Sequence, residues 1–446
     1  MKKDGVSRRG FVGMVSASAL SMPAAAYKRI PGSNDRINIG AIGCGHRAAG
    51  HRRMCKMVEK QGNVRIGAVC DIWNKNRERA AADVNRLFGE APKTFQHSED
   101  LLALPEIDAV MIATGDHQHT PLLLDTVRAG KDCYCEKPMA NRLAIAKEAR
   151  DTVLASDRIV QMGSQWVSDP YHRKVREIIR SGRLGKITRL EQQWNYNGPR
   201  WHDPRGKNIA EIREQDTDWK RWLAGRAYRP FDPVVYFEFR IFKEFSGGIT
   251  DQWMSHGSGL CHFFLDVGIP DDMVAAGGIF AWKDVRENPD TFEALATYQK
   301  EGILYSFAVM FGNSYGDHTT IHGRQGTLHA VGGEGSPQWW FRNEMPPVWR
   351  SNRPGDQRLP DTLDPELVTI PGHPEIPDVE QSDDSKPHMM NWVECMRSRK
   401  RPHGHIMTGY NHAVTIIMAT KAYREGKKVW WDRKKEEIVD RPPART

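Results

Sequence analysis

The sequence predicts an α/β fold in two parts: an N-terminal Rossmann domain with a doubly wound parallel sheet, and a C-terminal α+β domain with a large open antiparallel sheet. Over residues 34–155, short apolar runs alternate with helical stretches, and parallel strands that are buried on both faces read as continuous apolar runs. Beyond residue 155, strands follow one another with short turns and few helices, which favours antiparallel pairing. At 446 residues the chain is long enough for two such cores.

The first domain, expected over residues 34–155, shows a regular alternation of elements. Parallel strands need crossover connections, and helical stretches lie between the apolar runs. Gly130 stands where a helix would end, directly before the run at 132–135. We expect strands at 36–42, 64–70, 108–113 and 132–135, and helices at 47–60, 74–88, 118–129 and 141–155.

The second domain, expected over residues 156–435, is built mainly from short strands. An irregular, aromatic-rich region at 194–245 interrupts them, and a Pro-rich polar stretch at 336–383 is typical of an extended surface excursion. Residues 436–446 are expected as a tail. The expected strands cover 186–194, 273–282, 291–299, 303–311, 318–323 and 327–332, and two closing helices, at 386–398 and 409–425, are free to pack back on the Rossmann domain.

Residues 1–33 have the features of an export signal and a linker. The stretch "SRRGFVGMVSASALSMPAAA" (7–26) combines paired arginines, a short apolar segment and a small-residue ending at Ala26. This order is typical of a twin-arginine signal cleaved near Ala26, and the alternative is a basic start to an ordinary helix. We therefore expect the twin-arginine export machinery to be a partner, and the mature protein to be periplasmic or otherwise exported.

The composition argues against several classes of protein. No apolar run reaches the roughly 18 residues of a membrane span, so no stable span is expected after cleavage. The formal charge of +8 is spread along the chain, and the densest run, 433–437, contains its own acids, which argues against nucleic-acid binding. Seven cysteines without a CxxC pair indicate that there is no disulfide framework.

The stretch "AIGCGHRAAGH" (41–51) is close to a dinucleotide-binding fingerprint. It follows an expected strand and opens an expected helix, which is the context that the fingerprint requires. Gly43 would make the tight turn, and Gly45 would let the backbone approach a pyrophosphate at the helix N-terminus. The alternative is a tight glycine turn that binds no ligand.

Three polar residues extend this prediction. Asp71, at the end of the second strand, is placed to accept hydrogen bonds from an adenosine ribose, and its carboxylate would repel a 2′-phosphate. NAD is therefore favoured over NADP. His46 and Arg47 follow the glycines directly, so they are candidates for holding the pyrophosphate.

"ATGDHQH" (113–119) lies at the carboxyl end of the strand at 108–113, on the edge where an open α/β sheet binds ligands. Thr114 and His119 are candidate cofactor-binding residues there. The alternatives are a helix cap for Thr114 and a core or surface position for the histidine. A zinc site on this HxH pattern is disfavoured because no further ligands stand nearby in sequence.

"CEKPMA" (135–140) places the charged pair Glu136 and Lys137 at the end of a buried strand, which is costly unless the charges have a partner or a task. Lys137 beside a nicotinamide could exchange protons with a substrate hydroxyl. Pro138 would fix the backbone and start the next helix. The alternative is a solvated lysine in a loop.

A predicted helix at 246–268 carries Asp251, His256 and His262. Spacings of five and six residues do not share one face of an α-helix, so a helical metal pair is disfavoured and no metal is expected. A single histidine that projects into a cleft is compatible with the pattern, and a satisfied core histidine is the alternative.

Taken in order, these stretches resemble the Gfo/Idh/MocA family, named for glucose-fructose oxidoreductase and inositol dehydrogenase. The resemblance covers 34–435 and is carried by "GAIGCGHRAAGH", by "ATGDHQHTPLLLDTVRAGKDCYCEKPMA", by "DWKRWLAGRAYRP" and by the Gly-Gly to His segment at 247–256. It implies a Rossmann domain followed by an open antiparallel sheet. It also implies NAD(P)-linked oxidation or reduction of a carbohydrate carbon, and a homo-oligomer.

The resemblance also implies roles for individual residues. Lys137 matches the lysine that shares in substrate binding and proton transfer, and Glu136 lies beside the cofactor. His119 matches a histidine near the nicotinamide, and His256 matches the histidine of the substrate domain. Asp251 is the nearest acid to a position where the family usually carries an aspartate.

This sequence departs from the family pattern at three positions. The usual acids four residues before and three residues after His256 are replaced by Gln252 and Gly259, and the third residue of the usual "ATP" is Gly115. Asp251 is one residue out of register, so it could substitute only if the backbone is locally different. These changes leave cofactor binding intact and question the ordinary proton relay.

Three functions are compatible with the sequence. The first is an exported NAD-dependent oxidoreductase that acts on a CH–OH group of a sugar, glycoside or polyol, with Lys137 or His256 as the proton acceptor. The second is a redox-neutral NAD-using glycosidase or epimerase, which would avoid the scarcity of free NAD outside the cytoplasm. The third is a non-catalytic carbohydrate-binding relative that has lost its relay.

Overall fold

The computed structural model describes residues 35–206, 209–331, 338–344, 366–368 and 385–443. Contacts divide the chain into a unit of residues 1–36 and a unit of residues 37–446, and the fold below is that of the second unit. The expected signal and linker, residues 1–33, lie outside the described residues.

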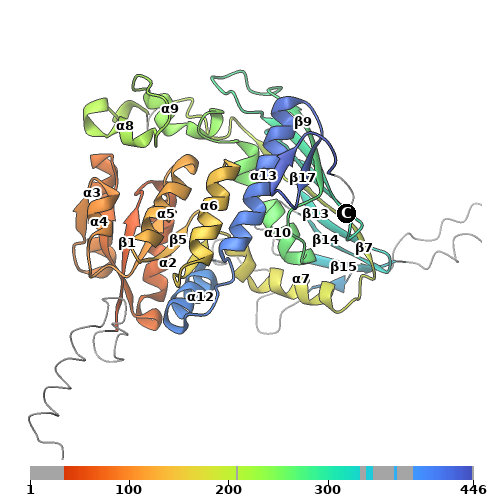
Figure 1. The fold of residues 1–446 in the computed structure, drawn as a ribbon, viewed down its shortest axis with the longest axis horizontal. Coiled ribbons are helices and arrows are strands. Elements are labelled where there is room, and N and C mark those ends of the chain that lie inside the picture. The colour runs from red at the N-terminus through yellow and green to blue at the C-terminus, as the bar shows by residue number, and fades with distance from the viewer. Residues whose placement is uncertain (1–34, 207–208, 332–337, 345–365, 369–384, 444–446) are drawn as a thin grey trace, which may run out of the picture. The chain divides into compact units, whose positions relative to one another are not determined.

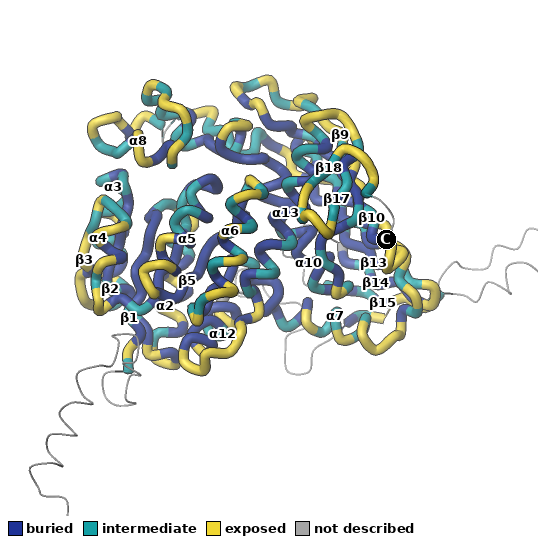
Figure 2. The backbone as a smooth tube through the Cα atoms, viewed as in Figure 1, coloured by how far each residue is buried: buried dark blue, intermediate teal, exposed yellow. Residues whose placement is uncertain are grey.

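The first sheet is parallel throughout, with the order β3-β2-β1-β4-β5-β6. The chain order reverses between β1 and β4, and such switch points open a ligand crevice at the carboxyl ends of the strands. Figure 2 shows the central strands of this sheet buried along their length. The strands are β1 (Ile37–Ile42), β2 (Val64–Cys70), β3 (Lys93–Phe95), β4 (Ala109–Ile112), β5 (Asp132–Cys135) and β6 (Val160–Met162).

Helices connect these strands as the alternation predicts. Three elements were not expected from the sequence. β3, an edge strand whose Lys93 and Thr94 are exposed, and the single-turn helix α4 have no extended apolar pattern. β6 pairs with β5 and so extends the first sheet beyond the expected boundary at residue 155. The expectation that Pro138 starts the next helix is wrong: the Lys137–Pro138 bond is cis and α6 begins at Leu143. The helices are α2 (His46–Gly62), α3 (Asn74–Phe88), α4 (Ser98–Leu102), α5 (His119–Arg128) and α6 (Leu143–Leu154).

The second sheet has the order β16-β15-β14-β13-β7-β11-β10-β9-β17-β18. Its pairs are antiparallel except for β7 with β11, which run parallel. The strands are β7 (Ile187–Gln193), β9 (Asp272–Gly278), β10 (Thr291–Tyr298), β11 (Ile303–Met310), β13 (His318–Gly323), β14 (Gly326–Val331), β15 (Trp339–Asn343), β16 (Glu366–Leu367), β17 (Val429–Asp432) and β18 (Glu437–Val439).

Two parts of this sheet differ from the sequence expectation. The stretch 336–383 was expected to be a surface excursion, but β15 pairs with β14 and buries Trp339 and Phe341. Apart from 338–344 and 366–368, that stretch lies outside the described residues. β18 falls within the expected tail, 436–446, and pairs with β17.

The two closing helices pack back on the Rossmann part of the chain. α12 (Ser385–Ser398) contacts α2, while α13 (Ile406–Glu425) contacts α6 on one side and β9 and α10 (Ser255–Leu265) on the other. Figure 1 shows α13, in blue, between α6 and the second sheet. The apolar core is therefore continuous from the first sheet to the second.

The chemistry of the core agrees with the composition. All seven cysteines are buried free thiols, which confirms the absence of a disulfide framework. Among the residues that the structure describes, no helix combines the length and the apolar character that crossing a membrane requires.

Candidate functional site

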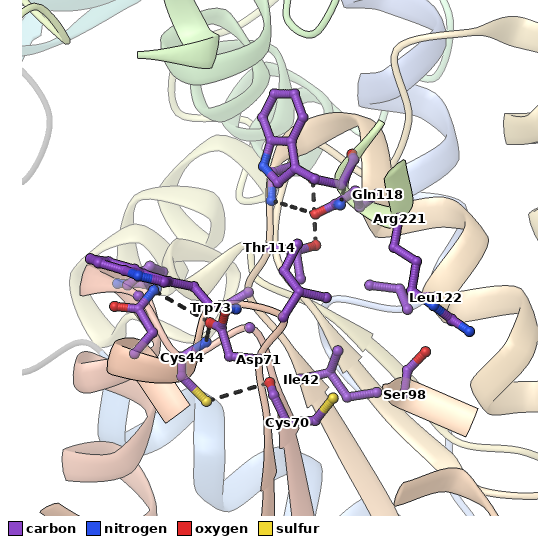
Figure 3. Close-up of a pocket in the computed structure, with 18 of the residues that line it drawn as sticks. Ile42, Cys44, Cys70, Asp71, Trp73, Ser98, Thr114, Gln118, Leu122 and Arg221 are labelled. Carbon is purple, nitrogen blue, oxygen red and sulfur yellow. Dashed lines mark hydrogen bonds between the residues drawn. The ribbon is translucent and has the colours of Figure 1, made fainter. Parts of the chain in front are cut away.

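A cavity of about 750 Å³ opens at the carboxyl edge of the first sheet, beside the switch point between β1 and β4. Its volume is that of a small-molecule or cofactor site. Figure 3 shows side chains from the ends of β1, β2 and β4 converging on it. Of the residues predicted from sequence, Gly43, Gly45, His46, Arg47, Asp71 and Thr114 line this cavity.

Gly43 and Gly45 are required at their positions for different reasons. Gly43 has φ +81°, and a Cβ there would lie 2.6 Å from the carbonyl oxygen of Ala113. Gly45 is the N-cap of α2, and a Cβ there would meet only Asn76, at 3.9 Å. The turn thus needs glycine at 43, while Gly45 leaves open space beside the first N–H groups of α2, where a phosphate can approach.

Asp71 lies at the centre of this edge. Its carboxylate accepts hydrogen bonds from the backbone N–H groups of Cys44 (2.7 Å) and Trp73 (2.9 Å), so it ties the glycine turn to the end of β2 (Figure 3). Burial raises the pKa of Asp71, and these two N–H groups oppose the shift. A carboxylate accepts more than two hydrogen bonds, so Asp71 can also accept from a ribose hydroxyl.

Arg47 is held by Glu136 beneath the cavity. The Nε of Arg47 donates to Glu136 at 2.6 Å, and His51 and Gln165 also contact this carboxylate, at 2.8 and 3.2 Å. Burial alone would raise the pKa of Glu136, but Arg47 and His51 hold it well below its ordinary value. Glu136 is therefore an ionised residue that positions Arg47 at the N-terminus of α2.

Lys137 is oriented by a chain of hydrogen bonds that reaches the end of β4. Its Nζ donates to the backbone oxygen of Gln252 at 2.8 Å and lies 3.3 Å from the side-chain oxygen of the same residue. The Gln252 amide donates in turn to Asp116 at 2.5 Å, which also accepts from Ser246 at 2.7 Å. An amide thus occupies the position where the family pattern carries an acid, and the nearest carboxylate on this path is Asp116.

Asp251 lies in a π-helical turn, Thr250–Met254, so the backbone is locally different from an α-helix. Its carboxylate accepts from the backbone N–H of Gly247 at 2.7 Å, while the neighbouring residue, Gln252, contacts Lys137. Burial, and then the charge of Asp116, raises the pKa of Asp251 to about 7. Asp251 therefore exchanges a proton near neutral pH, but its hydrogen bond with the Gly247 backbone has a structural role.

This pKa predicts a pH dependence of stability. The folded state holds a proton that the unfolded chain releases near pH 4, so stability falls as pH rises from about 4 to 7. Between pH 5 and 8 the loss is about 2–3 kcal/mol. We expect Asp251→Asn to reduce the difference in melting temperature between pH 5 and pH 8.

Asp266→Asn is the matched control, because Arg180 and Arg176 lower the pKa of that partly exposed acid. The prediction for Asp251→Asn would be contradicted if the variant kept the full wild-type difference in melting temperature between pH 5 and pH 8.

His256 and His119 lie outside the cavity lining. His256, in α10, stacks on Trp166 with ring centroids 4.4 Å apart, and burial together with the charge of Lys137 lowers its pKa well below the ordinary value. His119 is buried, and its Nδ1 donates to the carbonyl oxygen of Pro138 at 2.9 Å. His256 is thus a neutral imidazole in the electrostatic neighbourhood of Lys137, and His119 fixes the turn that carries Lys137.

A segment of residues 209–241, here named the strap, covers the cavity from the side opposite the sheet. It contains α8 (Trp219–Trp222), α9 (Pro233–Phe237) and the 3-10 turn Phe239–Ile241, and Figure 1 shows α8 and α9 beyond the carboxyl edge of the first sheet. The strap contributes Arg221, Trp222, Ala224, Tyr236, Phe237, Phe239 and Arg240 to the cavity lining.

Ion pairs and aromatic contacts hold the strap to the Rossmann part of the chain. Glu211 pairs with Lys75 (3.0 Å) and Arg79 (2.8 Å) of α3, and Arg221 pairs with Glu99 of α4 (2.5 Å). The ring of Trp73, which follows Asp71, meets the edge of Phe237 at 5.4 Å. A ligand in the cavity would therefore be enclosed by both parts of the chain.

Sequence reasoning did not identify Gln252 as a contact of Lys137, nor the strap as part of the cavity. The only signal for Gln252 was its position four residues before His256. Within the described ranges, no three His, Cys, Asp or Glu side chains come together in a way that would hold a metal ion.

The fold and the cavity define a dinucleotide-binding protein with a Rossmann domain and a second domain built on an open sheet. Residues 37–164 match the model of the Gfo/Idh/MocA family, which is described as an oxidoreductase family with an NAD-binding Rossmann fold. This part of the chain is therefore similar to the NAD-binding Rossmann domain of that oxidoreductase family.

Curated relatives extend the comparison. The chain is 30% identical over 191 residues to an inositol 2-dehydrogenase of Saccharopolyspora erythraea, covering 43% of this chain and 54% of the relative. It is 34% identical over 154 residues to the inositol 2-dehydrogenase of Serratia proteamaculans, covering 34% of this chain and 43% of that relative. The matched part thus spans about half the length of these relatives.

Solved structures share the fold over most of both chains. Levoglucosan dehydrogenase in complex with NADH superposes with a TM-score of 0.65 at 16% identity, covering 88% of this chain and 98% of the other. The WlbA dehydrogenase of Bordetella pertussis, in complex with NADH and UDP-GlcNAcA, superposes with a TM-score of 0.62 at 17% identity. The match covers 89% of this chain and 99% of the other. At these identities the likeness establishes the arrangement of both domains.

Proposed function

We propose that this protein is an exported NAD-dependent oxidoreductase that acts on a CH–OH group of a sugar, glycoside or polyol. The observation that carries the proposal is the placement of Lys137, which follows β5 directly and is oriented by Gln252, next to a cavity built on the dinucleotide turn. The inositol dehydrogenases and the levoglucosan dehydrogenase with NADH support a sugar or polyol as the substrate class.

The residues of the cavity fit NAD. Gly45 leaves space for a pyrophosphate at the N-terminus of α2, Arg47 supplies a positive charge there, and Asp71 can accept from the adenosine ribose. NAD, when bound, would supply an acceptor for the hydride of the substrate carbon. The chain itself would orient the hydroxyl group and take its proton at Lys137, with the neutral imidazole of His256 nearby.

The test is to mix the purified protein with a panel of sugars, glycosides and polyols and to follow absorbance in the reduced-nicotinamide band by stopped flow. Growth or bleaching of this band with one class of substrate is the expected result. A flat trace with every member of the panel would contradict the proposal.

A redox-neutral reaction is the second candidate, because two features favour a retained cofactor. The strap encloses the cavity, and residues 7–26 have the pattern of a twin-arginine signal, whose export route carries folded proteins. In such a reaction the hydride would return to the substrate, as in a glycosidase or epimerase. For this reaction we expect deuterium exchange at the carbon next to the oxidised carbon. A requirement for stoichiometric added NAD would contradict a redox-neutral reaction.

Retention of NAD gives a prediction for the strap. Removing its ion pairs with a Glu99→Ala/Glu211→Ala double variant should increase the rate of NAD release by about three- to tenfold, because exposed ion pairs each contribute up to about 1 kcal/mol. The measurement is native mass spectrometry of the remaining NAD at intervals after desalting.

Glu148→Ala is the control, because Glu148 pairs with Arg128 between two helices outside the strap. Release at the wild-type rate from the double variant would show that the strap does not retain the cofactor.

Export and assembly are parts of the same proposal. A change of the paired arginines to lysine, Arg8→Lys/Arg9→Lys, should leave the protein inside the cytoplasm if residues 1–33 direct twin-arginine export. We also propose a homo-oligomer, which sedimentation of the mature protein would test.

A further inference from the structure

Arg240 is a cavity residue that the proposed reaction leaves without a role. It belongs to the turn Phe239–Ile241 of the strap and lines the same cavity as the fingerprint glycines. Its electrostatic neighbours are Asp116, Arg200 and Glu136. Asp116 holds the Gln252 amide that contacts Lys137, and Glu136 precedes Lys137 in sequence. Arg240 therefore lies at the Lys137 end of the cavity.

The backbone around Arg240 is fixed, while its guanidinium forms no direct ion pair with the nearby acids among the described residues. Asn288 donates to the carbonyl oxygen of Arg240 at 2.9 Å, and the N–H groups of Glu287 and Asn288 donate to that of Ile241. Across the described part of the chain, the Arg240 guanidinium has no hydrogen bond or ion pair and packs over the ring of Phe239 at 4.4 Å. Because this guanidinium is half-buried and has no direct partner, an anionic ligand that pairs with it in the cavity would be favoured.

Arg200 is a second guanidinium of the same kind. It lies between the rings of Tyr196 and Trp253, 5.0 and 5.6 Å from their centroids, and its Nε is buried without a hydrogen-bond partner among the described residues. Arg200 lies outside the cavity lining, but it is an electrostatic neighbour of Arg240, and Trp253 directly follows Gln252, which contacts Lys137. Two like charges in a poorly solvated site repel each other unless an anion lies between them.

We propose that Arg240 and Arg200 bind an oxyanion carried by the substrate, so that the substrate is an anionic sugar, such as a sugar acid or a sugar phosphate. Guanidinium groups present paired N–H donors that match a carboxylate or a phosphate. The pyrophosphate of a bound cofactor would be held elsewhere, beside Gly45 at the N-terminus of α2. This inference rests on the proposed function and narrows its substrate class.

The test measures binding to the NAD-loaded protein by intrinsic tryptophan fluorescence, because Trp253 lies beside Arg200. The probes are D-glucuronate, D-glucose 6-phosphate and D-glucose. At least one anion should bind ten- to a hundredfold more tightly than glucose, in line with hydrogen bonds between charged groups. The anion that does so distinguishes a carboxylate from a phosphate.

Substitution of Arg240 tests whether this residue causes the preference for the anion. Arg240→Gln should reduce the preference for the anion to threefold or less, and Arg240→Lys should keep part of it. Arg226→Gln is the matched control, because Arg226 is also a half-buried strap arginine, but its Nε donates to the Glu244 carbonyl oxygen and it lies outside the cavity lining. The NAD content of each variant, by native mass spectrometry, reports whether the cavity is formed.

Two results would overturn the inference. If neither anion binds more tightly than glucose, the site is not selective for an oxyanion, and reduction of NAD by neutral sugars would then leave the proposed function standing. If Arg240→Gln lowers the NAD content and leaves the preference for the anion unchanged, Arg240 serves the cofactor instead.

Discussion

Replacing Lys137 with alanine should lower kcat by a factor of about 10² to 10⁴, which is the usual contribution of a positioned proton-transfer group. The reason is geometric: the lysine Nζ is held by the backbone oxygen of Gln252 at 2.8 Å, next to the cavity. Because Lys137 lies outside the cavity lining, the NAD content should remain at the wild-type level. The measurement pairs the rate of NAD reduction with native mass spectrometry of the same sample.

The control for this prediction is Lys147→Ala, because Lys147 is a half-buried lysine of α6 whose Nζ donates only to the carbonyl oxygen of Lys435 among the described residues. It should keep full activity. If Lys137→Ala retains wild-type turnover, Lys137 does not take part in the proposed reaction. Turnover in the wild type that is lost in this variant would exclude a non-catalytic carbohydrate-binding protein.

The part of the fold that the sequence predicts well is the part whose pattern is local. The apolar runs at 36–42 and 64–70 became β1 and β2, and the helix expected at 74–88 is α3. Because parallel strands end at one edge, the residues after them, Gly43, Asp71 and Thr114, meet in one cavity.

The strap could not be predicted in the same way, because its contacts join residues far apart in sequence. Glu211 meets Arg79 across 132 positions, and Arg221 meets Glu99 across 122. The aromatic-rich pattern at 194–245 indicates buried side chains, but it does not say which surface they cover. The cavity wall opposite the sheet is therefore visible only in the structure.

The segment around Asp251 shows a second limit of sequence reasoning. The argument that Asp251 and His256 do not share a face assumes α-helical geometry, whereas residues 250–254 form a π-turn with hydrogen bonds between residues five apart. A π-turn contains one more residue than an α-helical turn, so it changes the direction in which the neighbouring side chains point. The structure accordingly brings Gln252 to Lys137 and leaves Asp251 on the Gly247 backbone.

Alanine substitutions at the two fingerprint glycines should affect different properties. Gly43→Ala should lower the stability of the protein, and Gly45→Ala should lower its affinity for NAD. Gly43→Ala places a methyl group 2.6 Å from the Ala113 carbonyl oxygen at φ +81°, so it should cost about 2–5 kcal/mol of stability through backbone strain and overpacking. Gly45→Ala has an ordinary φ of −69° and its nearest neighbour at 3.9 Å, so stability without NAD should change by less than about 0.5 kcal/mol.

The same methyl group at position 45 would fill the space through which the backbone approaches a pyrophosphate, so NAD affinity should fall by about ten- to a hundredfold. Thermal unfolding of NAD-free protein measures the first effect, and titration with NAD measures the second. Gly259→Ala serves as the helical control, because a Cβ there meets nothing within 4 Å. Wild-type NAD affinity in Gly45→Ala would mean that the cofactor phosphates do not lie at the N-terminus of α2, and the assignment of the cavity would then have to be abandoned.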